Sequence, residues 1–152
     1  MDPVQKWLKL YRSDNKLVRI RAAKGLLNLG SQVPLWVILS ILDSQSDVGV
    51  AGSTERALLV RHDKELVSEM ISRLKSSNEF IREVACKVLG GLGDRTATSP
   101  LLGMLEDPYL MVRRTAAFSL ASISDPTAIP ELRKQYTLQR PIQIWNWRLV
   151  QP

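Results

Sequence analysis

The sequence predicts an all-α protein, built as a solenoid of stacked helix–turn–helix units. Two observations lead to this prediction: a segment with helical periodicity recurs about every 31 residues, and a second set of apolar helical segments lies between the copies. The composition fits a folded domain, because 45% of the 152 residues are hydrophobic and 24% are charged. Disorder is therefore not expected, and a disulfide scaffold is excluded because Cys86 is the only cysteine.

The recurring segment is clearest at three places that align without gaps, residues 18–30, 81–93 and 112–124. The last two copies are 31 residues apart and the first two are 63 apart, which predicts a divergent copy between them, starting at Val50. Apolar residues at i, i+4, i+8 and i+11 give each clear copy one stripe along a helix. The stripes are Val18, Ala22, Leu26 and Leu29; Ile81, Ala85, Leu89 and Leu92; and Val112, Ala116, Leu120 and Ile123.

Two features of these segments predict how the helices pack and end. The alanine at the centre of each stripe allows a neighbouring helix to approach closely. Gly30 and Gly93 follow the stripes at the point where a helix commonly ends in the left-handed conformation that glycine tolerates best. We therefore expect each helix to stop there.

The second set of helices is predicted from apolar spacing and from prolines near the helix starts, where a missing N–H costs little. These segments are Pro3–Arg12, Pro34–Asp43, Lys64–Lys75, Ser99–Glu106 and Ala128–Tyr136. The predicted array covers residues 1–136 and is followed by an irregular C-terminal tail or cap over 137–152. Its units are roughly 3–30, 31–62, 63–93, 94–124 and a half unit, 125–136.

Two stretches carry a resemblance to a known family: L-E-D-P-Y-L-M-V-R-R-T-A-A from Leu105 to Ala117, and I-R-E-V-A-C-K-V-L-G-G-L-G-D from Ile81 to Asp94. They resemble the HEAT repeat family, in the short form known as the phycobilisome-lyase-type HEAT-like repeat. The resemblance covers about residues 3–136. It implies a right-handed α-solenoid of about four repeats with a shallow concave surface.

The resemblance also implies a polar ladder between repeats, made by an aspartate in the turn and an arginine early in the second helix. Asp107 and Arg113 occupy these places. Arg19 and Arg82 keep the arginine, although serines stand where the aspartate is expected, and Ala51 replaces the arginine in the divergent copy. We therefore expect an incomplete ladder.

No residue pattern predicts catalysis, a metal site or a bound cofactor. His62 stands beside an aspartate at a helix boundary, without the nucleophile or orienting group that general-base chemistry requires. Cys86 aligns with Ala23 and Ala117, which predicts a buried small side chain rather than a reactive thiol. One cysteine and one histidine make no zinc site.

The formal net charge of +6 is concentrated at the N-terminal end. Residues 1–30 carry seven basic and two acidic residues, a net charge of +5, and the remainder carries +1. Such a basic end could attract an acidic protein, a phosphate or a nucleic-acid backbone, or could be a solvated helix surface.

Four basic residues are candidates for partner binding, because they lie on the second helices of the repeats and the ladder does not explain them. Acidic Glu55 and Glu83 interrupt this set, which argues against a continuous track for duplex DNA. The candidates are Arg21, Lys24, Lys87 and Arg114.

The C-terminal tail breaks the repeat pattern after Pro141 and contains Trp145 and Trp147. One interpretation is a cap over the apolar face of the last repeat. Another is an exposed aromatic anchor for a partner, since tryptophan is enriched at binding hot spots. A third is that the chain was cut from a longer array.

Together these observations predict a non-catalytic scaffold or adaptor that binds another protein through the concave face. The alternatives are a bilin-lyase-like or chaperone-like protein, which the resemblance implies, and a nucleic-acid-binding module. No membrane span is expected, because the most apolar run, 33–42, covers about half of the ~20 residues needed. The first residues lack the features of a secretory signal, which predicts an intracellular protein, whether alone or in a larger assembly.

Overall fold

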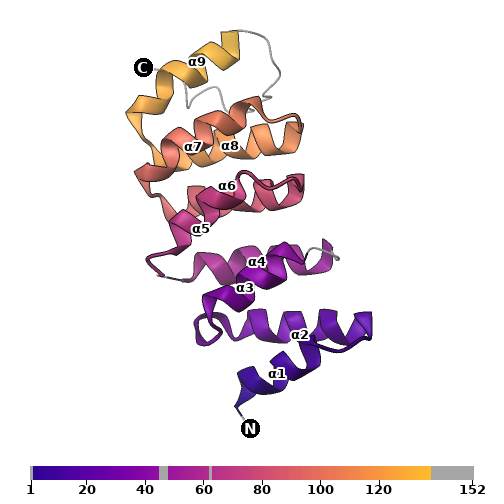
Figure 1. Cartoon of the computed structure of the whole chain (residues 1–152). Coiled ribbons are helices and arrows are strands. Elements are labelled where there is room, and N and C mark those ends of the chain that lie inside the picture. Colours follow the sequence, from indigo (N-terminus) through magenta and orange to yellow (C-terminus); the bar gives the residue numbers. More distant parts are fainter. Residues whose placement is uncertain (1, 45–47, 62, 138–152) are drawn as a thin grey trace. The chain divides into compact units, whose positions relative to one another are not determined.

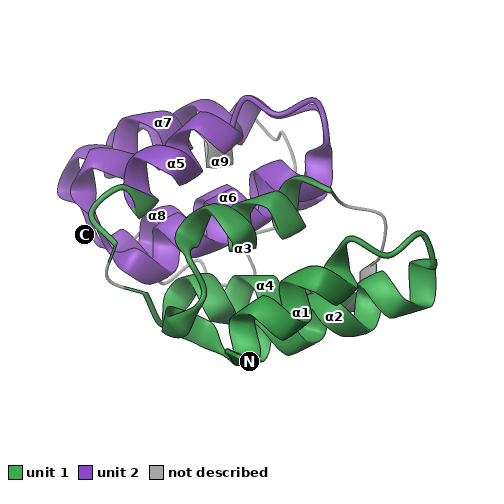
Figure 2. Cartoon of the chain, turned by 60° about the horizontal axis from the view of Figure 1, so that its bottom comes forward, with its two compact units in different colours: residues 1–66 green, residues 67–152 purple. Residues whose placement is uncertain are grey.

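The structure is a computed structural model that describes residues 2–44, 48–61 and 63–137. Every regular element in these ranges is an α-helix or a 3-10 helix, which confirms the all-α prediction (Figure 1). Within the same ranges, no helix is long and apolar enough to cross a membrane. The chain divides into two compact units, unit 1 (residues 1–66) and unit 2 (residues 67–152), each described separately below (Figure 2).

The helices alternate between a shorter first helix and a longer second helix, as the repeat pattern predicts. Proline stands at or directly before the start of α1 and α3, and asparagine caps α2 and α6 by accepting backbone N–H bonds. The first helices are α1 (Pro3–Tyr11), α3 (Leu35–Asp43), α5 (Leu66–Arg73), α7 (Thr98–Gly103) and α9 (Ile129–Thr137). The second helices are α2 (Lys16–Asn28), α4 (Val48–Leu59), α6 (Glu79–Leu92) and α8 (Leu110–Ile123).

The predicted left-handed residues lie at the helix ends. Gly93 has φ +69° and ends α6, and Gly30 has φ +55° just after α2. At the end of α8 the same conformation is adopted by Ser124, with φ +55°. The left-handed conformation usually favours glycine, but serine adopts it at this position. The turn geometry is therefore repeated even where the glycine is replaced.

Unit 1 contains α1 to α4, in which α2 packs against both α1 and α4. The stripe alanine Ala22 and leucine Leu26 have no exposed surface, nor does Ile38 of α3. In the divergent repeat on α4, Thr54 takes the place of the stripe alanine and is fully buried. Its hydroxyl donates to the carbonyl of Val50 at 3.0 Å, which satisfies the only polar group that this substitution adds to the core.

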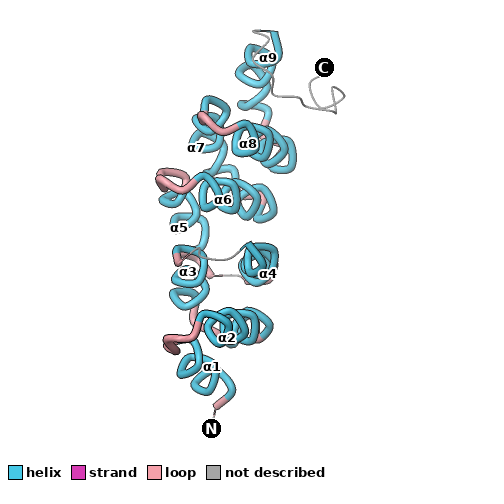
Figure 3. The backbone as a smooth tube through the Cα atoms, turned by 90° about the vertical axis from the view of Figure 1, so that its right-hand side faces the viewer, coloured by secondary structure: helices cyan, strands magenta, loops and turns pink. Residues whose placement is uncertain are grey.

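Unit 2 is built around the contact between α6 and α8, which lie side by side (Figure 3). Ala85 and Ala116 are completely buried in their stripes. The two helices approach closely at Gly90, where an added Cβ would lie 2.7 Å from the Cα of Ser119. At the same crossing the Ser119 hydroxyl donates to the carbonyl of Cys86 at 2.6 Å.

Candidate protein-binding groove

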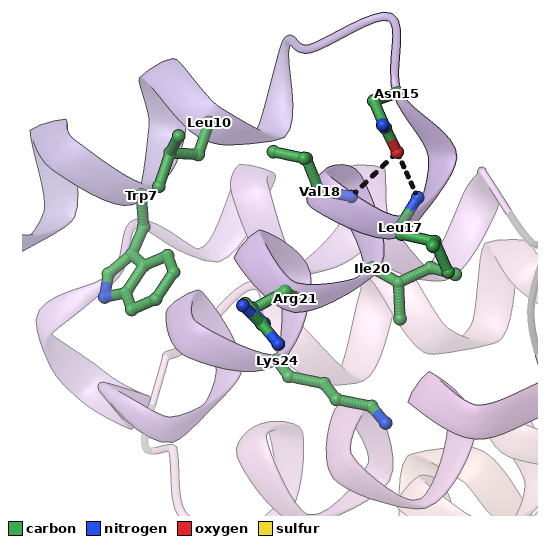
Figure 4. A pocket seen from close by; sticks show the side chains of 8 residues that line it. All are labelled: Trp7, Leu10, Asn15, Leu17, Val18, Ile20, Arg21 and Lys24. Carbon is green, nitrogen blue, oxygen red and sulfur yellow. Dashed lines mark hydrogen bonds between the residues drawn. The ribbon is translucent and has the colours of Figure 1, made fainter.

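An open groove of about 660 Å³ lies along α1 and α2 in unit 1 (Figure 4). One wall comes from α1 and the other from the N-terminal part of α2 and its capping residue. The lining residues are Trp7, Leu10, Asn15, Leu17, Val18, Ile20, Arg21 and Lys24.

The groove ends where α1 meets α2. The Trp7 ring lies directly over Gly25, because a Cβ added to Gly25 would be 2.5 Å from two of the ring atoms. The missing side chain at Gly25 therefore makes room for the indole. Along the groove before this point, Leu17 is 75% exposed, whereas Val18 and Ile20 are half-buried.

The groove combines apolar surface with positive charge. Arg21 and Lys24 lie on the open side of α2 and are both exposed. Neither forms an ion pair or a side-chain hydrogen bond with another described residue, so both charges are available to a ligand. A surface of this kind is suited to a partner that presents apolar side chains together with carboxylates.

The four cations predicted to bind a partner are divided between the two units. Arg21 and Lys24 share the groove in unit 1, whereas Lys87 and Arg114 lie in unit 2. The Lys87 ammonium pairs with Glu83 of the preceding helical turn at 3.0 Å, and Arg114 is half-buried on α8. The tail tryptophans Trp145 and Trp147, and His62, lie outside the described residues.

The residues that align with these cations in the other repeats also differ in their burial. Lys24 aligns with Lys87 and with Phe118, and all three are exposed. Arg21 instead aligns with Val84 and Thr115, which are both buried. Arg21 therefore occupies a position that faces a neighbouring helix elsewhere in the array.

One further cation was missed by the sequence analysis. Arg56 on α4 shares the register of Lys24 and is exposed, with its guanidinium 3.4 Å from the Ser53 hydroxyl. The repeat alignment contains this information. When one extra residue is allowed before Val50, the divergent repeat aligns with the first copy and places Arg56 opposite Lys24.

The ladder residues predicted in unit 2 meet in a buried ion pair. Arg82 donates to both carboxylate oxygens of Asp107, Nε at 2.6 Å and Nη2 at 3.0 Å, and both side chains are less than 10% exposed. Burial opposes ionisation of Asp107. The hydrogen bonds from Arg82 and from the Tyr109 amide, with the charges of Arg82 and Arg113, outweigh it and lower the pKa of Asp107. The hydrogen bond to Asp107 in turn raises the pKa of Arg82.

Each ladder arginine also binds the turn that precedes its own helix. The Nη1 atom of Arg82 donates to the carbonyls of Ser76 and Ser77, six and five residues earlier. Arg19 and Arg113 repeat this pattern with the carbonyls at 13 and 14 and at 107 and 108. Among the described residues, only the Arg82–Asp107 pair joins an arginine of this set to the carboxylate of the following repeat.

A second buried arginine, Arg61, was not identified from the sequence. It stands at the i+11 position of the divergent stripe, where the other copies have Leu29, Leu92 and Ile123, and it is 7% exposed. Its Nη1 donates to the carbonyls of Val33 at 2.6 Å and Gly30 at 3.2 Å, and its guanidinium pairs with Asp63. Arg61 thereby holds the turn after α2 to the end of α4.

Cys86 lies in the core of unit 2, as the repeat alignment predicts. Cys86 is fully buried, and desolvation raises the pKa of its thiol to about 12. No group of three or more His, Cys, Asp or Glu side chains among the described residues could hold a metal ion.

Comparison with known proteins assigns the repeats. The family model for HEAT repeats matches residues 67–141. These residues are HEAT repeats. The HEAT-repeat segment thus contains the Arg82–Asp107 pair, the close α6–α8 crossing and the left-handed turns that end both helices.

Two further comparisons concern a curated protein and a solved structure. Phycocyanobilin lyase subunit alpha of Picosynechococcus sp. is 36% identical over 78 residues, a match that covers 47% of this chain and 29% of the relative. The chain therefore spans less than a third of that curated protein. A crystal structure of an engineered protein, solved by the Northeast Structural Genomics Consortium, matches 99% of this chain and 76% of its own. It has a TM-score of 0.50 and 21% sequence identity, so it supports the fold alone.

Proposed function

We propose that this chain is a non-catalytic scaffold or adaptor that binds another protein through its second helices. Stacked helical repeats bury their stripes against one another and leave the remaining helix surfaces free for partners. The observation that carries the proposal is the groove on α2, where a largely exposed leucine lies beside two cations that have no partner among the described residues.

The groove has the composition expected of a protein-binding surface rather than of a phosphate site. Leu17 and Ile20 supply apolar area, and the Trp7 indole supplies an aromatic wall. Arg21 and Lys24 at the edge would improve selectivity and the association rate through charge complementarity. A surface for duplex nucleic acid would instead need a longer run of cations.

The proposal is tested by crosslinking and affinity capture with the full chain, followed by identification of the captured proteins after nuclease treatment. We expect defined protein partners, in an amount that increases with the amount of folded chain. These partners should not be captured when the chain has been unfolded beforehand. Enzymatic turnover that is abolished by a single substitution would contradict the non-catalytic part of the proposal. Capture of nucleic acid alone would contradict the protein-binding part.

The second candidate function is a role in bilin attachment, favoured by the similarity to phycocyanobilin lyase subunit alpha. It predicts that the chain binds a bilin, which would appear as a red shift and sharpening of the bilin absorption band when the protein is added. Absorption spectra recorded with the native and the heat-unfolded chain decide this point. An unchanged band with the native chain would remove this candidate.

A further inference from the structure

One row of the α2 face that lines the groove corresponds to a helix-stacking row in unit 2. Leu17 and Lys24 lie beside the stacking positions and align with Met111 and Phe118, which are exposed. Aligned by the repeat, Arg21 and Gly25 match Thr115 and Ser119 of α8. In α8 these two residues are buried, and Ser119 contacts α6 at Gly90 and at the carbonyl of Cys86. The equivalent row on α2 is thus a surface shaped to receive another helix.

The helix α1 covers only one end of this row in the described structure. Trp7 lies over Gly25, while Leu17 remains 75% exposed and Ile20, Arg21 and Lys24 line the open groove. Arg21 is thus the stacking position that α1 leaves uncovered, with the exposed Leu17 one helical turn before it.

The charge at this face restricts which helix can pack on it. Thr115 and Ser119 let α8 pack on α6 without a charge in the contact, whereas the corresponding place on α2 holds Arg21. An apolar helix that docked here would bury a guanidinium without a partner, which is unfavourable. A helix with carboxylates beside its apolar stripe would pair Arg21 and Lys24 and cover Leu17 at the same time.

We infer that the groove binds an acidic amphipathic helix of a partner protein, lying along α2 in the way that α6 lies along α8. This inference rests on the proposed scaffold function and specifies the kind of partner segment. The surrounding surface favours the same ligand, since residues 1–30 carry seven basic residues and two acidic ones.

The probe is a fluorescein-labelled amphipathic peptide as long as α2, with leucines on one face and glutamates beside them, measured by fluorescence anisotropy with the full chain. The test variant is Arg21→Glu/Lys24→Glu. The matched control is Lys64→Glu/Lys75→Glu, which makes the same charge change at two exposed lysines outside the groove. We expect the test variant to lose about tenfold or more in affinity and the control to lose much less.

Two further measurements separate a specific groove from general attraction between opposite charges. A peptide with lysines in place of the glutamates should bind the Arg21→Glu/Lys24→Glu variant better than the wild type. Leu17→Ala should lower the affinity for the glutamate peptide by about fivefold. The Leu17 side chain is too exposed for this substitution to affect folding. Circular dichroism confirms that each variant is folded.

Several results would overturn the inference. One is equal peptide binding by the wild type and the charge-reversal variant. A second is self-association in sedimentation equilibrium that the same variant abolishes, because the occupant is then a second copy of this chain. A third is tighter binding of a duplex DNA probe than of the peptide, lost in that variant. If the wild-type chain captures partner proteins and the charge-reversal variant captures the same ones equally well, only this inference fails. If the wild-type chain captures no protein, the proposed function fails with it.

Discussion

Units 1 and 2 use arginine in two different ways to join successive repeats. In unit 2, Arg82 near the start of α6 reaches forward to Asp107 in the turn before α8. In unit 1, Arg61 after the end of α4 reaches back to the turn after α2. The two connections therefore lie at opposite ends of the second helices, and the same repeat pattern is stabilised from either end.

The two units also differ in what holds the other end of these helices. In unit 2, the Thr98 hydroxyl lies 2.8 Å from the Asp125 carboxylate, so the turns after α6 and α8 are joined as well. In unit 1, an exposed bond of 3.0 Å joins the hydroxyls of Tyr11 and Ser44, close to the turns before α2 and α4.

The largest effect is expected from Asp107→Asn in unit 2. The substitution leaves the Arg82 guanidinium buried without its carboxylate, and breaking such a pair costs about 3–5 kcal/mol. Chemical denaturation followed by circular dichroism measures the loss. A loss below about 1 kcal/mol would show that water replaces the carboxylate and that the pair is not a main support of unit 2.

The same substitution should change the acid dependence of stability. The pKa of Asp107 is lower in the folded chain than in the unfolded one. The ionised carboxylate therefore makes its full contribution to folding stability above the ordinary pKa of about 3.9. That contribution is lost as the pH falls through the folded pKa. The difference in stability between the wild type and Asp107→Asn should therefore be largest at neutral pH and shrink in acid.

Cys86 offers a reporter that distinguishes the two units. It is the only cysteine, it lies in the core of unit 2, and its thiol has a pKa of about 12. Labelling by a thiol reagent should therefore require opening of unit 2. We expect Asp107→Asn to accelerate labelling in native buffer far more than a substitution in unit 1 does. Equal acceleration by both would mean that the units open together.

An intermediate effect is expected from Arg61→Met in unit 1. Methionine keeps much of the side-chain volume but leaves the buried carbonyl of Val33 without its donor, at a cost of about 1–3 kcal/mol. Denaturation of this variant beside Asp107→Asn compares the two connections directly. A larger loss of unfolding free energy for Arg61→Met than for Asp107→Asn would show that the arginine connection in unit 1 contributes more to stability than the one in unit 2.

The smallest effect is expected from Tyr11→Phe. Its bond to Ser44 is exposed, so water can replace the partner, and the change in stability should stay within about 0.5 kcal/mol. A thermal unfolding curve is sufficient to check it. A clear decrease in Tm would show that the end of unit 1 near Tyr11 is fastened more firmly than an exposed hydroxyl pair suggests.

The sequence predicts the helices and their ends well, because stripes such as Val18 to Leu29 and glycines such as Gly93 act through local spacing and backbone conformation. It does not reveal Arg61, because burial of a charged side chain depends on acceptors 28 and 31 residues earlier in the chain. Nor does it show that Arg21 and Lys24 face one groove, since this depends on how far α1 covers α2. The Trp7–Gly25 contact, which sets that coverage, is likewise invisible in either segment alone.

The arginine bonds to the preceding turn have a consequence for how the chain folds. Arg19, Arg82 and Arg113 each bind carbonyls only five and six residues earlier, so these contacts close very short loops. Each second helix can thus fix its own entry turn before the next repeat has been synthesised. Contacts of such low sequence separation favour rapid folding, one repeat at a time from the N-terminal end. The bond from Arg82 to Asp107 spans 25 residues and can form only afterwards, as the step that locks one finished repeat to the next.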